Sequence, residues 1–316
     1  MAFKGKKIAV VVPAHNEERF IGRVLVTMPP FVDEIIVVDD NSTDDTQKVL
    51  AETIKRISIG SDVIKNNTNL GVGASIVVGY KKAIEKKADV IAVMAGDGKM
   101  NHDDLPAVLD PIVYDKADYV KGNRLITKDV RTVMPGVRYF GNSLLTVLTK
   151  IVSGYWHVMD PQCGYTTISR STLEKMDLDT LYPRYGFPND MLVRLNVLNA
   201  RVKDVPVKAV YGAEKSGIKL RSYIPMVSML LLRGFLWRLK EKYLIRDFHP
   251  LVLFYLMGFL LLPLGTILGL FLIYVKYLGG QILTTPSVVL CALLIITGLQ
   301  SILFAMMFDM EYNKPK

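Results

Sequence analysis

The stretch IAVVVPAHNEE at residues 8–18 decides the fold, because an unbroken apolar run passes directly into polar residues. Similar runs follow at 34–40, 62–65 and 89–95, separated by stretches with helical spacing at 17–28, 43–57 and 72–86. Val- and Ile-rich runs joined by helices are typical of a parallel sheet covered on both faces. The sequence therefore predicts an α/β domain that binds its ligand at the carboxyl ends of the strands.

Composition and charge exclude several classes of protein. With 50% hydrophobic and 22% charged residues, the 316-residue chain is neither disordered nor of low complexity. Two cysteines, Cys163 and Cys291, cannot form a disulfide framework or a four-thiolate zinc site. The net charge of +9 suits nucleic acid, anionic lipid or a polyanionic substrate. Because much of the positive charge lies in 215–246, beside an apolar region, we expect a membrane surface and no nucleic-acid partner.

Two long uncharged stretches, 250–275 and 277–308, end the chain. About 20 apolar residues cross a bilayer, so residues 250–316 are predicted to form a transmembrane hairpin. Basic residues precede the first span, whereas the connecting loop has only Lys276. This bias predicts a cell-membrane protein with two spans, whose amino-terminal domain and both termini are cytoplasmic. The basic residues are Arg233, Arg238, Lys240, Lys242 and Arg246.

The segment between the two regions has apolar positions at helical spacing beside basic ones. We interpret 221–249 as an amphipathic helix in the membrane interface, which leaves 1–220 as the cytoplasmic domain. A short soluble helix packed on that domain is the alternative. The pair Gly265 and Gly269 permits close helix contact and therefore a homo-oligomer.

Polar residues follow the predicted strands where a ligand would bind. A dinucleotide oxidoreductase would place G-x-G-x-x-G after the first strand, and a P-loop enzyme would place G-x-x-x-x-G-K-[ST] there. This chain has PAHNEE at 13–18 instead, which argues against both classes. Gly71 and Gly73 form a glycine-rich turn after the third strand, which either cradles a ligand or lets a helix approach the sheet.

Seven motifs in order resemble those of a family 2 glycosyltransferase with the GT-A fold. They are VVVPAHNEE at 10–18, IIVVDDNSTDDT at 35–46, NLGVGAS at 69–75, VMAGDGKM at 93–100, VKGNR at 120–124, DPQCGYTTIS at 160–169 and EKSGIK at 214–219. With the interface helix and the two spans, the whole chain is similar to polyprenyl-phosphate glycosyltransferases of the dolichyl-phosphate-mannose and dolichyl-phosphate-glucose synthase type. The resemblance implies a mainly parallel, Rossmann-like sheet with helices on both faces.

The resemblance also implies a site for a nucleotide-sugar. Asp97 would bind Mg²⁺ or Mn²⁺ at the donor diphosphate, since these hard ions prefer oxygen ligands. Such synthases usually carry D-x-D followed by L-Q, whereas this chain has Ala95-Gly96-Asp97 and then Gly98-Lys99. Lys99 would therefore share the diphosphate with the metal or partly replace it. The implied donor residues are Pro13, Ala14, His15, Asn16, Glu17, Asp39, Asp40, Gly71, Ala95, Gly96 and Lys99.

The expected acceptor is a lipid phosphate, which needs cations and no general base. A phosphate monoester has its second pKa near 6 and is mostly dianionic at pH 7, whereas a hydroxyl acceptor needs base catalysis. Asp190 lies where hydroxyl-transferring relatives have their base, although a helix cap is equally consistent. Asp97, Arg124 and Asp190 are the catalytic candidates. The candidates for the acceptor phosphate, any of which could instead be a solvated surface charge, are Arg124, Arg138, Lys215, Ser216 and Arg221.

The sequence thus predicts a membrane-bound, inverting transfer of a hexose from a nucleotide-sugar, such as GDP-mannose, UDP-glucose or UDP-GlcNAc, to dolichyl or polyprenyl phosphate. The product would feed protein or surface-glycan glycosylation. One alternative is elongation of a lipid-linked glycan or a processive polysaccharide, but the chain lacks the Q-x-x-R-W signature and the additional spans of processive relatives. A membrane protein that binds a nucleotide-sugar without turnover is the other alternative, motivated by the missing carboxylate.

Overall fold

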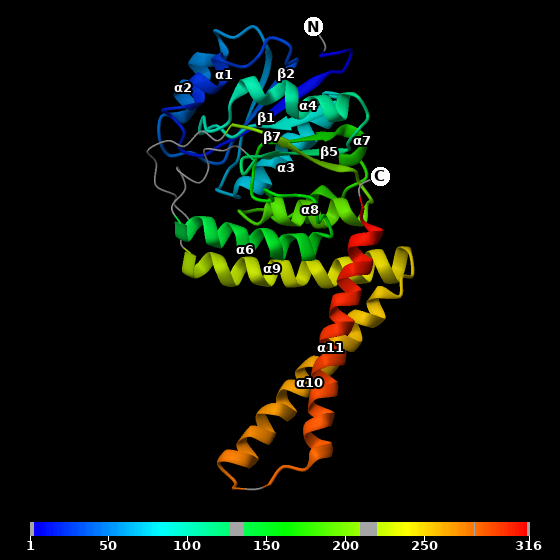
Figure 1. The fold of residues 1–316 in the computed structure, drawn as a ribbon. Helices are drawn as coiled ribbons and strands as arrows, with labels where there is room; N and C mark the ends of the chain where they lie inside the picture. Colours follow the sequence, from blue (N-terminus) through cyan, green and yellow to red (C-terminus); the bar gives the residue numbers. More distant parts are fainter. Residues whose placement is uncertain (1–2, 127–135, 209–219, 281, 315–316) are drawn as a thin grey trace. The chain divides into compact units, whose positions relative to one another are not determined.

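A seven-stranded sheet forms the centre of the amino-terminal part of the protein (Figure 1). The computed structural model describes residues 3–126, 136–208, 220–280 and 282–314. The strand order is β3-β2-β1-β4-β6-β5-β7. The strands are β1 (Ile8–Ala14), β2 (Glu34–Asp39), β3 (Gly60–Lys65), β4 (Val90–Val93), β5 (Tyr119–Asn123), β6 (Thr166–Ser169) and β7 (Val202–Pro206).

The sheet is mainly parallel, which confirms the predicted fold class. Strand β1 pairs in parallel with β2 and β4, β2 with β3, and β5 with β7. Only β6 runs the other way, between β4 and β5. Ala14 is opposite Asp39 in the register of β1 and β2, so the polar residues that follow these two strands lie side by side.

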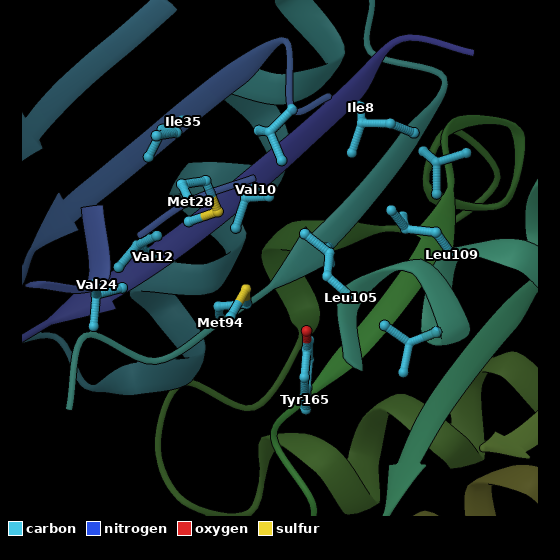
Figure 2. Close-up of a cluster of buried hydrophobic side chains, with 14 of the residues drawn as sticks. Ile8, Val10, Val12, Val24, Met28, Ile35, Met94, Leu105, Leu109 and Tyr165 are labelled. Carbon is cyan, nitrogen blue, oxygen red and sulfur yellow. The ribbon is translucent and has the colours of Figure 1, made fainter. Parts of the chain in front are cut away.

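Strand β1 is buried on both faces, which explains its unbroken apolar sequence. Val10 and Val12 face the first core, formed with helices on one side of the sheet, whereas Ala9 and Val11 face the second core on the other side. Figure 2 shows the first core, with Tyr165 at its edge. Because successive side chains of a strand point to opposite faces, a strand between two helical layers must be apolar at every position.

Helices cover both faces of the sheet, and further helices follow in the carboxyl-terminal part of the chain. They are α1 (Ile21–Val26), α2 (Thr46–Ile54), α3 (Val72–Glu85), α4 (Leu105–Val113), α6 (Gly136–Ser153), α7 (Arg170–Leu173), α8 (Phe187–Val197), α9 (Leu220–Lys240), α10 (Leu251–Tyr277) and α11 (Thr285–Tyr312), with 3₁₀ turns at His102–Asp104 and Leu178–Thr180 and a π-helical turn at Glu241–Arg246. The helix predicted at 17–28 is shorter than expected. Residues 17–20 form a loop instead, in which the Glu17 N–H donates to Thr46 Oγ1 at 2.8 Å.

Helices α6, α8 and the first part of α9 lie on one side of the sheet (Figure 1). A Cβ on Gly234 of α9 would lie 3.5 Å from Val193 of α8 and 3.8 Å from Val152 of α6, so the three helices are in contact. The opposite faces are apolar and exposed, with Leu144, Val147 and Leu148 on α6 and Ile224, Met229 and Leu232 on α9. Exposed apolar stripes of this kind on neighbouring helices mark a surface that contacts a membrane or another protein.

The chain divides into two compact units, residues 1–235 and 236–314, and the division falls within α9. In the second unit, α10 and α11 form a helical hairpin. Both helices are long and apolar enough to cross a bilayer, and only 11% and 17% of their most apolar windows are buried, which indicates membrane association. The predicted boundaries at 220 and 249 stay predictions.

Small residues bring the two helices of the hairpin together. A Cβ on Gly265 would lie 2.9 Å from the Ile295 nitrogen, and a Cβ on Gly298 would lie 2.6 Å from the Leu262 nitrogen. A Cβ on Gly269 would lie 3.2 Å from Cys291 Sγ. The two glycines from which we inferred a homo-oligomer therefore face α11 of their own chain, and their position gives no support to an oligomer.

A buried ion pair lies at the root of this hairpin. Arg238 and Asp309 are both fully buried, and the guanidinium donates to both carboxylate oxygens, at 2.9 and 3.1 Å. The Tyr243 hydroxyl donates to Asp309 Oδ1 at 2.6 Å, and Lys242 Nζ donates to Asn313 at 2.7 Å. Burial, and then the nearby Arg238 charge, lowers the pKa of Lys242 to about 7. The end of α9 and the π-helical turn are thus bound to the end of α11 by charged and polar groups.

We expect Asp309→Ala to lower the stability of the hairpin by about 3–5 kcal/mol, because it leaves a buried guanidinium without its counter-charge. Thermal unfolding in detergent measures the change. Glu311→Ala, which removes an exposed pair between the end of α11 and Lys314, is the control and should cost less than about 0.5 kcal/mol. Equal losses in the two variants would contradict the prediction. The double variant with Arg238→Met and Asp309→Leu should recover most of the stability.

Candidate functional site

The carboxylate of Asp40 joins the end of β2 to the glycine-rich turn before α3. Asp40 is 4% exposed, its Oδ1 accepts the Leu70 N–H at 2.9 Å, and its Oδ2 accepts the Gly71 N–H at 2.8 Å. Buried Asn66 donates to Oδ1 at 2.8 Å. On the other side, the Asp40 N–H donates to the Ala14 carbonyl at 2.8 Å, and the Asp40 carbonyl lies 2.9 Å from His15 Nδ1. Asp40 therefore holds three of the predicted donor residues together.

Asp39 and Asn16 organise the loops on either side of Asp40. Buried Asp39 accepts from the Ser42 N–H at 3.0 Å and from Gln47 Nε2 at 2.6 Å. Asn16 is exposed with φ at +58°, and its side-chain oxygen accepts the Thr43 N–H at 2.8 Å. The loops after β1 and β2 thus form one hydrogen-bonded layer, with His15 and Asn16 on its exposed surface.

The glycine-rich turn is in contact with the segment that leads into α8. A Cβ on Gly73 would lie 2.4 Å from the Tyr182 carbonyl, and a Cβ on Gly71, whose φ is +99°, would lie 2.6 Å from the Pro183 carbonyl. Asp190 of α8 accepts the Tyr182 N–H at 3.0 Å and Arg194 Nε at 2.9 Å. Both glycines are therefore required by close backbone approach, and Asp190 fixes the segment that approaches them.

The loop after β4 carries Asp97 and Lys99. The Lys99 N–H donates to Asp97 Oδ1 at 3.0 Å, and Lys99 Nζ donates to Oδ2 at 3.1 Å. The Gly96 N–H donates to the Pro13 carbonyl at 3.1 Å, which joins this loop to the end of β1. A cavity of about 410 Å³ opens beside Asp97 and Lys99, between this loop and α1.

Arg124 follows β5 and is held by Asp160. The guanidinium donates to Oδ2 through Nε at 2.8 Å and to Oδ1 through Nη2 at 3.1 Å, and the Arg124 backbone N–H donates to Oδ2 at 3.2 Å. Asp160 is 3% exposed, whereas 31% of the Arg124 side chain is exposed. Two residues further, Gln162 donates to Asn189 at 2.7 Å, next to Asp190. A short turn at 160–162 thus connects both of these catalytic candidates.

Behind Arg124 lies a second set of buried charges. Lys121 is fully buried and donates to the Cys163 carbonyl at 2.6 Å, and burial lowers the pKa of this amine. Asp204 accepts from Asn123 at 2.8 Å and from the Met159 N–H at 2.6 Å, and burial raises the pKa of its carboxyl. These groups fix the turn that carries Asp160.

Most of the predicted site residues come together at the carboxyl edge of the sheet. Pro13, Ala14, His15, Asp40 and Gly96 are joined by the hydrogen bonds above. Asp97 and Lys99 are in the adjoining loop, and Arg124 and Asp190 are linked through the turn at 160–162. The acceptor candidates are less complete, because Lys215 and Ser216 lie outside the described residues, as do the side chains of Arg138 on α6 and Arg221 on α9.

The residues present do not fit a divalent-ion site built by protein side chains alone. Within the described ranges, no group of three or more His, Cys, Asp or Glu side chains is placed to hold a metal ion. Asp97 is the predicted ligand, but each of its oxygens accepts a hydrogen bond from Lys99. An ammonium group opposes a second cation at the same carboxylate.

Sequence reasoning gave no role to Asp160, Lys121 or Tyr182. Asp160 begins one of the seven motifs, and a charged residue inside an otherwise apolar or small-residue motif was the available signal. Lys121 lies in VKGNR within a strand that is buried throughout, where an amine is unexpected. Tyr182 approaches Gly73 through its backbone carbonyl, and no residue type marks that contact.

We expect Gly73→Ala to destabilise the protein by about 1–3 kcal/mol, because the added methyl group meets a backbone carbonyl that Asp190 holds in place. Chemical denaturation of the purified protein measures the loss. Gly141→Ala, in a helix with open space around the added methyl group, is the control and should be neutral or stabilising by about 0.5–1 kcal/mol. A neutral Gly73→Ala would show that the turn moves freely.

Comparisons with known proteins agree with this geometry. A sequence model of glycosyl transferase family 2 matches residues 9–177. A "UDP-N-acetylglucosamine–dolichyl-phosphate N-acetylglucosaminyltransferase" from Methanococcus voltae is 31% identical over 218 residues, covering 65% of this chain and 86% of the relative. An "undecaprenyl-phosphate mannosyltransferase" from Micrococcus luteus is 28% identical over 207 residues, covering 65% and 84%.

Among solved structures, glucosyl-3-phosphoglycerate synthase from Mycobacterium tuberculosis, with Mn²⁺, UDP and glucosyl-3-phosphoglycerate bound, superposes with a TM-score of 0.55. Sequence identity is 20%, and the match covers 74% of this chain and 80% of the other. This likeness shows the fold, and it confirms the predicted GT-A architecture. Since the family match spans more than half of the sequence, the chain belongs to glycosyl transferase family 2.

Proposed function

We propose that this glycosyltransferase moves a hexose from a nucleotide-sugar to dolichyl or another polyprenyl phosphate at the cytoplasmic face of a membrane. The names of the relatives from Methanococcus voltae and Micrococcus luteus support the acceptor class. Two apolar helices and the exposed apolar faces of α6 and α9 support a reaction at a bilayer surface. The product would supply protein or surface-glycan glycosylation.

The observation that carries the proposal is that the carboxylates of the predicted site are already engaged by cations or N–H groups. Asp190 accepts from Arg194 and the Tyr182 N–H, Asp97 from Lys99, and Asp40 from Leu70 and Gly71. A hydroxyl acceptor needs a base that takes its proton, whereas a phosphate dianion attacks without one. The site therefore suits an acceptor that carries its own charge.

The chemistry is a single in-line displacement at the anomeric carbon. An oxygen of the lipid phosphate forms the new bond to carbon, the bond from carbon to the donor diphosphate breaks, and its electron pair leaves with the nucleoside diphosphate. One displacement inverts the anomeric configuration. The loops after β1, β2 and β4 would hold the donor, and Arg124, oriented by Asp160, would bind the acceptor phosphate.

A divalent ion at the donor diphosphate stays a prediction. Glucosyl-3-phosphoglycerate synthase, which shares the fold, was crystallised with UDP and Mn²⁺ or Mg²⁺. An ion at Asp97 of this chain is untested. The side chains that the structure describes do not form a ligand set of their own, and no step above is routed through a metal.

A donor screen in membrane vesicles tests the function and the orientation together. Labelled UDP-GlcNAc, UDP-glucose and GDP-mannose are supplied outside inverted or right-side-out vesicles that contain the protein and dolichyl phosphate. We expect lipid-linked sugar from at least one donor in inverted vesicles only, because nucleotide-sugars do not cross the bilayer. Binding of a donor without product from any of them would favour a non-catalytic protein, and product from right-side-out vesicles would reverse the proposed orientation.

We expect Arg124→Lys to raise the KM for the lipid phosphate by about tenfold or more, since an ammonium keeps the charge but cannot form the two-oxygen contact with Asp160 that orients it. Steady-state kinetics with varied acceptor measure the change. Arg170→Lys, at a partly exposed arginine whose N–H bonds to Asp89 before β4, is the matched control and should leave KM unchanged. An unchanged KM in Arg124→Lys would remove Arg124 from the acceptor site.

A further inference from the structure

We propose that the ammonium group of Lys99 supplies the positive charge for the donor diphosphate, so that this protein binds its nucleotide without a divalent ion. The inference rests on the proposed function, because it assumes that the donor diphosphate reaches the loop after β4. It goes further by assigning the charge compensation to a residue of this chain.

Lys99 is held against the carboxylate of Asp97, the residue at which a metal ion was expected. Its backbone N–H and its Nζ both donate to Asp97, at 3.0 and 3.1 Å, so the carboxylate fixes the lysine in a closed two-point contact. The Lys99 side chain is 40% exposed and lines the cavity of about 410 Å³ that also contains Asp97. The ammonium is therefore both oriented and accessible to a ligand.

The local charge gives a divalent ion no advantage at this loop. From Ala95 to Met100 the loop carries one carboxylate and one ammonium, so its formal charge is zero. A divalent ion gains little attraction from a neutral loop, and it would be repelled by an ammonium bonded to the one carboxylate. A diphosphate meets less repulsion there than at a pair of carboxylates. It can accept a charge-assisted hydrogen bond from Lys99 when the contact with Asp97 opens.

Asp97 then has a different role from the one predicted. Instead of binding a metal ion, it orients the ammonium group, and the turn at Gly98, whose φ is +68°, brings Lys99 back onto it. During transfer the same ammonium would stabilise the negative charge that develops on the departing diphosphate. No additional reactant is needed, because the electron pair leaves with the nucleotide as described above.

Calorimetric titration of the full-length, detergent-solubilised protein with UDP and with GDP tests the proposal, in EDTA and in Mn²⁺. We expect the wild type to bind one of the two nucleotides in EDTA with an affinity within about threefold of that in Mn²⁺. Lys99→Gln should bind it about tenfold more weakly in EDTA, which is the worth of one charge-assisted hydrogen bond. Lys99→Arg should keep most of the metal-free affinity.

Lys82→Gln is the matched control, since it removes the same charge from an ion pair with Glu85 at the far end of α3, and it should change nothing. The proposal is overturned if the wild type binds neither nucleotide in EDTA, or if Lys99→Gln matches the wild type there. Together with the donor screen, this titration separates failure of the inference from failure of the proposed function. Lipid-linked sugar with nucleotide binding that EDTA abolishes defeats this inference alone, whereas metal-free binding with no product from any donor defeats the proposed function alone.

Discussion

The hydrogen bonds accepted by the buried carboxylate of Asp40 are the constraint on which the site depends. Each hydrogen bond to a charged group contributes about 1.5–3 kcal/mol, and a buried carboxylate without them would be strongly destabilising. Through Leu70 and Gly71, Asp40 fixes the turn before α3. This turn contacts the segment before α8. The carboxyl edge of the sheet and the helix that carries Asp190 are thereby parts of one connected framework.

Within this framework, Asp39 and Asp40 hold the loops around them in place. Their oxygens accept hydrogen bonds from the loops around them, and His15 and Asn16 are among the exposed residues of these loops. A nucleoside that reached this edge would meet a surface whose shape the two carboxylates maintain. We therefore propose that Asp39 and Asp40 position the loops of the donor site, and their direct contact with the donor stays a prediction.

Local pattern was sufficient to predict the first half of the domain but not the second. Strands β1 to β4 and the helices between them follow from apolar runs and helical spacing. Each connection in this half carries the helix that a crossover between parallel strands needs. The antiparallel strand β6 and the contact between Arg124 and Asp160 join residues far apart in the chain, and neither has a local signature. The start of α1 was also missed, since bonds to the loop after β2 compete with helix formation there.

The sequence gives the number of basic residues before the first predicted span but not which of them are exposed. Of the basic residues before the first predicted span, Arg238 and Lys242 are buried and bonded to Asp309 and Asn313, whereas Arg233, Lys240 and Arg246 are exposed. A sequence shows the sign of a side chain and not its burial. The topology argument therefore rests on three exposed cations, which is still an excess over the single Lys276 in the connecting loop.

A cation that is already paired with a carboxylate attracts a phosphate less than an unpaired one, and this bears on the acceptor site. Arg124 is fixed by a carboxylate that already balances its charge, so on its own it would add direction more than attraction for an incoming phosphate. A dianionic acceptor approaching a diphosphate needs further cations, and the predicted ones are Arg138, Lys215 and Arg221. Arg138 belongs to α6 and Arg221 to α9, and Lys215 precedes α9 in the sequence. The proposed binding of a lipid phosphate thus draws further charge from α6 and from the sequence around the start of α9, which would tie acceptor recognition to a bilayer surface.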